Sequence, residues 1–172
     1  MPHRQRPKRM LAVDARAASE KSRLVALRMS ILMLRLIESW RQRFKDYDSA
    51  MILLAIGAIV GERLTRTPLE PDLQDLARPI PKELLTPCNI NSIAAATGIN
   101  RETARRKVNK LIAAGLVERA PDGSIGFSPG FTQRQEPAAI LRSQLETTIR
   151  TVNDLLRDGV LTFEATNAGT PS

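Results

Sequence analysis

Residues 91–128 read NSIAAATGINRETARRKVNKLIAAGLVERAPDGSIGFS, and this stretch predicts more of the fold than any other. Its order of residue types indicates a short helix, a tight turn, a second helix and a two-stranded hairpin. We expect Asn91 to cap the first helix and Gly98 to end it, because glycine enters the left-handed conformation at little cost. Asn100 has the side chain of an N-cap, so the second helix should begin at Arg101.

A turn with a defined mechanism follows the second helix. In residues 121–124 the proline fixes the entry and Gly123 accepts a positive φ, and the short flanking stretches are strand-like. We expect Arg119, on the first of these strands, to lie near a DNA phosphate or the minor groove. Two helices and a hairpin in this order predict a winged helix-turn-helix, a module that places its second helix in the major groove.

The predicted second helix, residues 101–114, is amphipathic. At 100° per residue Ala104, Val108, Leu111 and Ile112 fall on one face, which we expect to be buried. The polar residues around the rest of the helix are the candidate DNA contacts: Arg101, Glu102, Thr103, Arg105, Arg106, Lys107, Asn109 and Lys110. Arginine can bind guanine through two hydrogen bonds, glutamate can accept one from cytosine, and flanking cations such as Arg105 and Lys107 suit phosphates. The alternative is an ordinary solvated helix face.

A resemblance to known regulators supports the interpretation of these polar residues as DNA contacts. Residues 93–117 resemble the winged helix-turn-helix of bacterial transcription regulators, and Arg101-Glu102-Thr103-x-x-Arg106 is similar to the recognition helix of the catabolite activator family. That resemblance implies base contacts by Arg101, Glu102 and Arg106 and a phosphate contact by Thr103. The ending LIAAGLVER also resembles MarR-type and GntR-type regulators. The chain upstream reads as helical, not β-rich, so the cyclic-nucleotide domain and its effector do not carry over.

Composition excludes several classes of function. The chain has one cysteine, Cys88, and one histidine, His3, so nucleophilic triads and histidine metal sites lack their parts. We therefore expect no enzymatic activity, no metal and no cofactor. The net charge of +8 favours a polyanionic partner. Residues 1–45 contain 12 Lys or Arg and three acids, and residues 89–130 contain six and three, so the excess lies at the N-terminus and in the proposed DNA reader.

Charge and periodicity also predict the remaining segments. Residues 1–13 are expected to form a basic disordered arm, and residues 14–45 one long dimerisation helix. The seam of that helix has the spacing of a coiled coil: Leu24, Leu27, Ile31 and Leu34. An amphipathic helix on a membrane surface is the alternative for this segment. Residues 46–130 are expected to be the winged domain, with a proline-rich insertion at 65–87 that contains no long helix.

The C-terminal part repeats the helical pattern. We expect residues 131–160 to form a helix that packs on the N-terminal one, within or between subunits, and residues 161–172 to be a tail. The seam of this helix includes Leu141, Leu145, Val152 and Leu155. No apolar stretch is long enough to cross a membrane, and no signal sequence follows the basic start, so we expect a cytoplasmic protein.

The sequence therefore predicts a mainly α-helical protein with a small β-hairpin wing and long N- and C-terminal helices. We expect it to bind double-stranded DNA as a homodimer formed through the N- and C-terminal helices. It should regulate transcription in a bacterium, with residues 101–114 in the major groove. No feature of the sequence identifies a small-molecule effector. The alternative is a winged-helix module that binds another protein through its long apolar helices.

Overall fold

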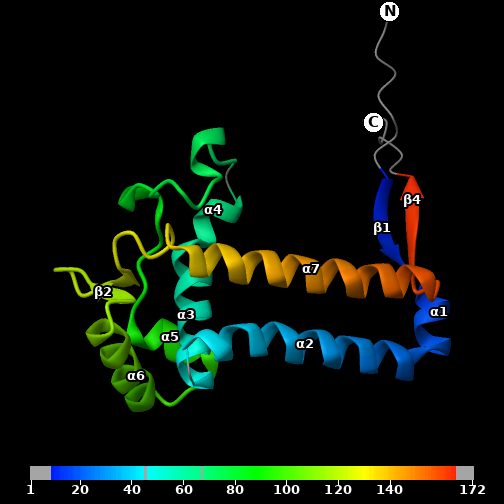
Figure 1. Ribbon diagram of the computed structural model, residues 1–172, viewed down its shortest axis with the longest axis horizontal. Coiled ribbons are helices and arrows are strands. Elements are labelled where there is room, and N and C mark those ends of the chain that lie inside the picture. Colours follow the sequence, from blue (N-terminus) through cyan, green and yellow to red (C-terminus); the bar gives the residue numbers. More distant parts are fainter. Residues whose placement is uncertain (1–8, 45, 67, 166–172) are drawn as a thin grey trace, which may run out of the picture. The chain divides into compact units, whose positions relative to one another are not determined.

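The computed structural model describes residues 9–44, 46–66 and 68–165 of the 172-residue chain (Figure 1). The described part is mainly helical, with seven α-helices and two small antiparallel sheets of two strands each. A mainly helical chain with a small hairpin is thus confirmed. The chain divides into unit 1, residues 1–36 with 145–172, and unit 2, residues 37–144.

Unit 2 is built around helix α3 (Tyr47–Val60). The elements that accompany it are α4 (Glu62–Arg66), α5 (Ile90–Thr97), α6 (Arg101–Ala113), β2 (Val117–Arg119) and β3 (Ile125–Phe127). Helix α3 packs against α5, α6 and β3, and its Ile52, Leu53 and Ile56 are 0% exposed. A helix that is apolar nearly all round requires such burial on several sides, which is why α3 occupies the centre of the unit.

The core of unit 2 joins the helices to the hairpin. Its members are Ile52, Leu53, Ile56, Cys88, Ile93, Ala104, Val108, Leu111, Val117 and Ile125. Beside this core Phe127 stacks on Phe131 with 4.9 Å between ring centroids, and Phe131 lies 6.5 Å from Phe44. Three of the four phenylalanines of the chain therefore cluster in unit 2.

The described residues of the proline-rich segment form two single turns and no long helix, as the prolines predict. These 3₁₀ turns are η1 (Pro71–Leu73) and η2 (Lys82–Leu84). Two hydrogen bonds tie the segment to the rest of unit 2: the Thr86 amide donates to the Val60 carbonyl at 3.0 Å, and the Gln133 side chain donates to the Leu76 carbonyl at 2.8 Å.

Unit 1 contains an antiparallel ribbon of two strands, β1 (Arg9–Val13) and β4 (Leu161–Ala165), which we call the terminal ribbon. The register runs from Arg9 opposite Ala165 to Val13 opposite Leu161. The predictions of a disordered arm and a frayed tail are therefore wrong for residues 9–13 and 161–165. The remaining residues of both segments, 1–8 and 166–172, lie outside the described residues. Each strand finds its hydrogen-bond partner at the other end of the chain, which neither local pattern reveals.

Two helices replace the single helix expected over residues 14–45: α1 (Ala15–Glu20) and α2 (Ser22–Phe44). Asp14 caps α1 by accepting a hydrogen bond from the Ala17 amide at 2.9 Å. The chain changes direction at Lys21, whose ammonium group donates to the Asp158 carbonyl oxygen. This long-range contact lies at the break between α1 and α2.

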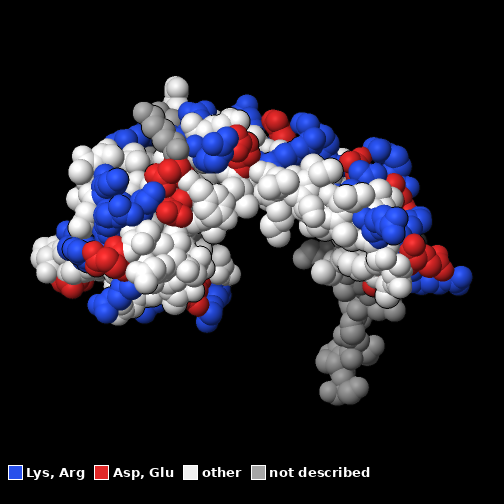
Figure 2. Space-filling model, turned by 90° about the horizontal axis from the view of Figure 1, so that it is seen from below, with Lys and Arg blue, Asp and Glu red and all other residues white. Residues whose placement is uncertain are grey.

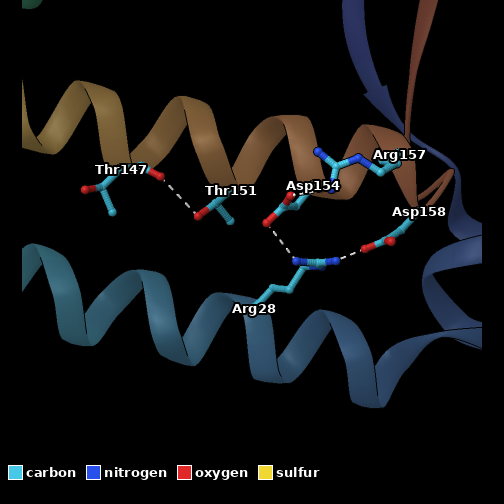
Figure 3. Close-up of polar contacts among 6 residues, drawn as sticks. All are labelled: Arg28, Thr147, Thr151, Asp154, Arg157 and Asp158. Carbon is cyan, nitrogen blue, oxygen red and sulfur yellow. Dashed lines mark hydrogen bonds and ion pairs between the residues drawn. The ribbon is translucent and has the colours of Figure 1, made fainter.

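Helix α7 (Gln135–Arg157) confirms the helix expected within residues 131–160. It ends before Gly159, whose φ of +71° turns the chain into β4. In unit 1 the Arg28 guanidinium of α2 bridges two carboxylates of this part of the chain (Figure 3). Its Nε donates to Asp158 at 2.6 Å and its Nη1 to Asp154 at 2.8 Å. The side chain of Arg28 is 25% exposed, so this is a partly buried ionic bridge between the two helices.

The packing of α6 yields a test of the fold. Val108→Asp should lower the free energy of unfolding of unit 2 by at least about 3–5 kcal/mol, because it places an unpaired carboxylate at a position that is 0% exposed. Urea unfolding followed by circular dichroism measures the change. Asn109→Asp adds the same charge at the exposed neighbouring position and should keep nearly the stability of the wild type. Equal stability of the two variants would contradict the packing.

Candidate nucleic-acid interface

The candidate interface begins with the geometry that presents α6. Helix α5 is capped by Asn89, which accepts a hydrogen bond from the Ser92 amide at 3.0 Å, while the Ser92 hydroxyl accepts one from the Asn89 amide at 2.9 Å. The expected cap at Asn91 is therefore wrong, and Asn91 lies inside the helix. The reciprocal pair Asn89-x-x-Ser92 is a capping box that was visible in the sequence. Buried Cys88 fixes the chain immediately before it.

The turn between α5 and α6 follows the prediction. Gly98 has a φ of +70°, the left-handed conformation that ends α5. Asn100 caps α6 by accepting a hydrogen bond from the Glu102 amide at 2.9 Å. Helix α6 then begins at Arg101, as expected. Two caps within three residues fix the direction in which α6 leaves the turn.

The two faces of α6 separate as the periodicity predicts. Ala104 and Val108 are 0% exposed and Leu111 is 5% exposed, so this side packs into the core. The exposed polar residues on the rest of the helix are Arg101, Glu102, Arg105, Arg106, Asn109 and Lys110, while Thr103 is half-buried. Among the described residues, Arg101, Arg106 and Lys110 have no hydrogen-bonded partner, so their charges face solvent.

Glu102 and Arg105 bind each other in a bidentate ion pair, with 2.9 Å from Nε and 2.6 Å from Nη2 to the carboxylate oxygens. The hydrogen bond from Arg105 lowers the pKa of Glu102, and the same bond raises the pKa of Arg105. We expected these residues to meet cytosine and phosphate separately. In the free protein the two side chains bind each other instead, so a ligand would have to break this ion pair to contact either of them. Exposed pairs of this kind are weak, so such an exchange is accessible.

Lys107 has a different environment from the flanking position we expected. Its side chain is only 16% exposed, and its ammonium group lies 2.7 Å from an Asp46 oxygen and 3.5 Å from an Asp48 oxygen. Asp46 is also the N-cap of α3 and accepts hydrogen bonds from the Ser49 amide and hydroxyl at 2.8 and 2.7 Å. Lys107 therefore ties α6 to the start of α3. Its ammonium group is already paired with Asp46 and Asp48, so Lys107 is no longer a candidate phosphate contact.

The charge state of this contact is well defined. Burial by itself would raise the pKa of Asp46, but the hydrogen bonds from Lys107 and Ser49 outweigh it and lower that pKa to about 2. The hydrogen bond to Asp46 raises the pKa of Lys107. Both groups are thus ionised at neutral pH. The pair joins α6 to the start of α3, a contact that the hydrophobic periodicity of the sequence does not predict.

Arg119 is exposed at the end of β2, at the base of the tight turn. Its Nη1 lies 3.4 Å from the Gly123 carbonyl oxygen, across the turn. Gly123 has a φ of +83°, as the Pro-Asp-Gly pattern predicts. The side chain of Arg119 thus lies along the hairpin tip and remains open to a ligand.

Lys82 is a cation near the hairpin tip that sequence reasoning missed. The pKa of Asp122 is lowered, first by hydrogen bonds from the Ser124 hydroxyl and amide and to a smaller degree by the charge of Lys82. Lys82 belongs to η2 in the proline-rich segment, and no local pattern connects that turn with the hairpin. Figure 2 shows Lys and Arg atoms interspersed with Asp and Glu atoms over the visible face of unit 2.

The described residues contain no group of His, Cys, Asp and Glu side chains that suits a metal ion. None of the helices in the described part combines the length and apolar character needed to cross a bilayer. No protein-family model, curated protein or solved structure matches the chain. The proposal below is therefore argued from the geometry and charges of α5, α6 and the hairpin.

The Lys107–Asp46 pair yields a test with a defined pH window. The folded-state pKa of Asp46 is lower than the ordinary 3.8, so folding favours the charged form. The resulting stability is fully present at neutral pH and is lost as pH falls from about 4 to about 2. Asp46→Asn keeps a capping oxygen and should cost about 1 kcal/mol at neutral pH, a figure reduced for solvent screening of a partly exposed pair.

Unfolding measured from pH 7 down to pH 2 checks this expectation: the difference between Asp46→Asn and the wild type should shrink through that window. Asp48→Asn is the matched control, because its oxygen lies farther from Lys107 and its removal should have a smaller effect. A difference that is independent of pH would mean that the ion pair does not contribute.

Proposed function

We propose that the protein is a sequence-specific double-stranded DNA-binding transcription regulator that acts in the bacterial cytoplasm as a homodimer, with α6 in the major groove. The order α5, turn, α6 and hairpin, packed on α3, supports the proposal, because a winged helix-turn-helix is expected to have this order of elements. The observation that carries the proposal is α6 itself. It is capped and fixed on its buried side, and its outward side presents Arg101, Arg106 and Lys110, which form no hydrogen bond or ion pair among the described residues.

The side chains of α6 divide into two roles. Arg101 and Arg106 are exposed and close to the start of the helix, the end that enters the groove most deeply in this module, so we assign them to base edges. Thr103, Asn109 and Lys110 are assigned to the backbone of the DNA. Lys107 positions α6 through Asp46 and does not contact DNA.

The Glu102–Arg105 ion pair could help α6 to distinguish cytosine from other bases, because each partner can be replaced by a DNA group. When phosphate approaches Arg105, the guanidinium can leave Glu102, and the freed carboxylate can then accept a hydrogen bond from cytosine. Opposite any other base the freed carboxylate would lack a donor, so the exchange would be unfavourable. Arg119 at the hairpin tip, with Lys82 near it, would hold the adjacent phosphates.

A protein-binding module is the second candidate, and one observation favours it. Eleven large apolar side chains in the described part of unit 1 are at least 38% exposed, which is more typical of an interaction surface than of an isolated domain. The two candidates differ in their response to salt, because phosphate contacts release counterions and apolar contacts do not.

The response to salt therefore separates the two candidates. We expect the logarithm of the affinity for a duplex of random sequence to fall linearly with the logarithm of salt, with a slope of about −3 or steeper. Arg119→Ala should make that slope shallower by about 1, as removal of one phosphate contact does. Arg78→Ala, which removes a charge that is paired with Asp72, is the control and should leave the slope unchanged. Absence of duplex binding at low salt would contradict the proposed function.

Sequence reading is tested at Arg106. Selection from a random duplex pool would first identify the preferred site of the wild type. Arg106→Ala should then weaken binding to that site by roughly 5- to 150-fold and relax the preference at one base pair, a guanine by the geometry of arginine. Arg16→Ala removes the same charge from unit 1 and should leave the preference unchanged. A profile for Arg106→Ala that parallels the wild type at every position would exclude Arg106 from base reading.

A further inference from the structure

Apolar side chains are distributed unequally between the two units. Among the described residues of unit 1 the fully or nearly buried apolar ones are Leu155 and Val160, whereas the core of unit 2 contains ten residues. Unit 1 nevertheless has eleven of the fifteen large apolar side chains that are exposed in the described residues. Its own elements therefore leave most of its apolar surface in contact with water.

One exposed surface is a stripe on α2, formed by Leu24, Leu27, Ile31 and Leu34, which we call the α2 stripe. These side chains are 38%, 57%, 48% and 68% exposed. The stripe runs for about 15 Å along the helix. A different face of α2 is used within unit 1, where Val25, Met29 and Leu32 are half-buried and Arg28 binds α7. Figure 2 shows uncharged side chains over much of the visible face on the right, with Lys and Arg atoms along its upper rim and toward its right-hand end.

The second exposed surface is one face of the terminal ribbon. Alternation along the strands places Leu11, Val13, Leu161 and Phe163 on the same face. Leu11, Val13 and Phe163 are 47%, 64% and 59% exposed. A two-stranded ribbon is marginally stable in water unless its apolar face is covered. The ribbon therefore requires a partner for that face.

We infer that the α2 stripe and this apolar face of the terminal ribbon bind a second copy of the chain. A large apolar side chain has on the order of 150 Å² of surface, the lower end of the range for aromatic ones, so seven that are about half exposed leave on the order of 500–600 Å² in water. A standard interface removes about 800 Å² from each partner, of which about 65% is apolar between identical subunits. The exposed area is thus enough for a stable dimer.

The choice of a second copy has two grounds. The four side chains of the α2 stripe are uncharged, and Arg28, which lies between Leu24 and Leu34 in the sequence, binds Asp154 and Asp158. On the ribbon face Leu11, Val13, Leu161 and Phe163 are uncharged, and Arg9 lies at the outer end of that face. Two identical surfaces can therefore meet across a two-fold axis without opposing like charges, although the chain carries a net charge of +8. The second ground rests on the proposed function, because two copies of α6 related by a two-fold axis would read the two halves of a palindromic site.

The test compares matched pairs of variants in the full-length chain. Leu27→Glu lies on the α2 stripe, whereas Met33→Glu is on the same helix, is similarly exposed at 60%, and lies roughly 140° from the stripe. Phe163→Glu lies on the apolar face of the ribbon, whereas Met10→Lys introduces a charge on the other face, opposite Glu164, at a position with the same exposure of 59%. All four residues are exposed within the chain, so the variants should fold, which circular dichroism checks.

Sedimentation velocity over a range of protein concentrations measures the dimer. The wild type and the two control variants should be dimers at micromolar concentration. Leu27→Glu and Phe163→Glu should each raise the dissociation constant at least about 100-fold, because two-fold symmetry places every substitution in the interface twice. A wild type that is monomeric, or a test variant that dimerises as tightly as its control, would overturn the inference.

The same samples separate this inference from the proposed function. Arg106→Ala should remain a dimer, because Arg106 belongs to unit 2 and lies outside both surfaces. If the wild type dimerises through these surfaces but binds no duplex, the contact between copies stands and the proposed function fails. If duplex binding persists in a wild type that is monomeric, the DNA-binding part of the proposed function stands, and the contact and the homodimer both fail.

Discussion

The burial of α3 is the constraint on which unit 2 depends. Helix α3 has few polar side chains with which to face water, so α5, α6 and the hairpin have to cover it. Ile52, Leu53 and Ile56 belong to one core with Val108 of α6 and Ile93 of α5. Because α6 is held on this side by apolar contacts, its opposite side is left with polar residues. The orientation of the proposed DNA-contacting face is therefore a consequence of the packing of α3.

The same helix shows how depth determines the role of a cation. Lys107 and Arg106 are adjacent and equally charged, yet Lys107 is half-buried against Asp46 and Arg106 is exposed. A cation near the core has to be paired because desolvation is unfavourable, and pairing with the N-cap of α3 fixes the end of a second helix at the same time. The neighbour that points to solvent keeps its charge available. One position along the helix thus separates a positioning residue from a candidate ligand contact.

Local patterns predicted much of unit 2 and much less of unit 1. The helix ends at Gly98 and Asn100, the buried face of α6 and the turn at Gly123 depend on neighbours within a few residues, so the sequence contains the necessary information. The pairing of β1 with β4, the break at Lys21 and the ion pair of Lys107 join residues that are far apart in the chain. Hydrophobic period and charge density do not encode such contacts. The DNA-binding role of α6 and the subfamily that its sequence resembles remain predictions.

The two units differ in the interactions that stabilise them. Unit 2 has a core of its own, so its surface is free to be selected for recognition. Unit 1 is held by the ionic bridge of Arg28 with Asp154 and Asp158 and by backbone pairing in the terminal ribbon, with little apolar burial. Ionic bridges and two-stranded ribbons contribute little net stability in water, so unit 1 on its own should be marginal. If its apolar surfaces meet a second copy, folding of unit 1 and association become one equilibrium, and dimer formation would then depend on protein concentration. A regulator built in this way would bring two copies of α6 to DNA only above the protein concentration at which two copies of unit 1 fold and associate.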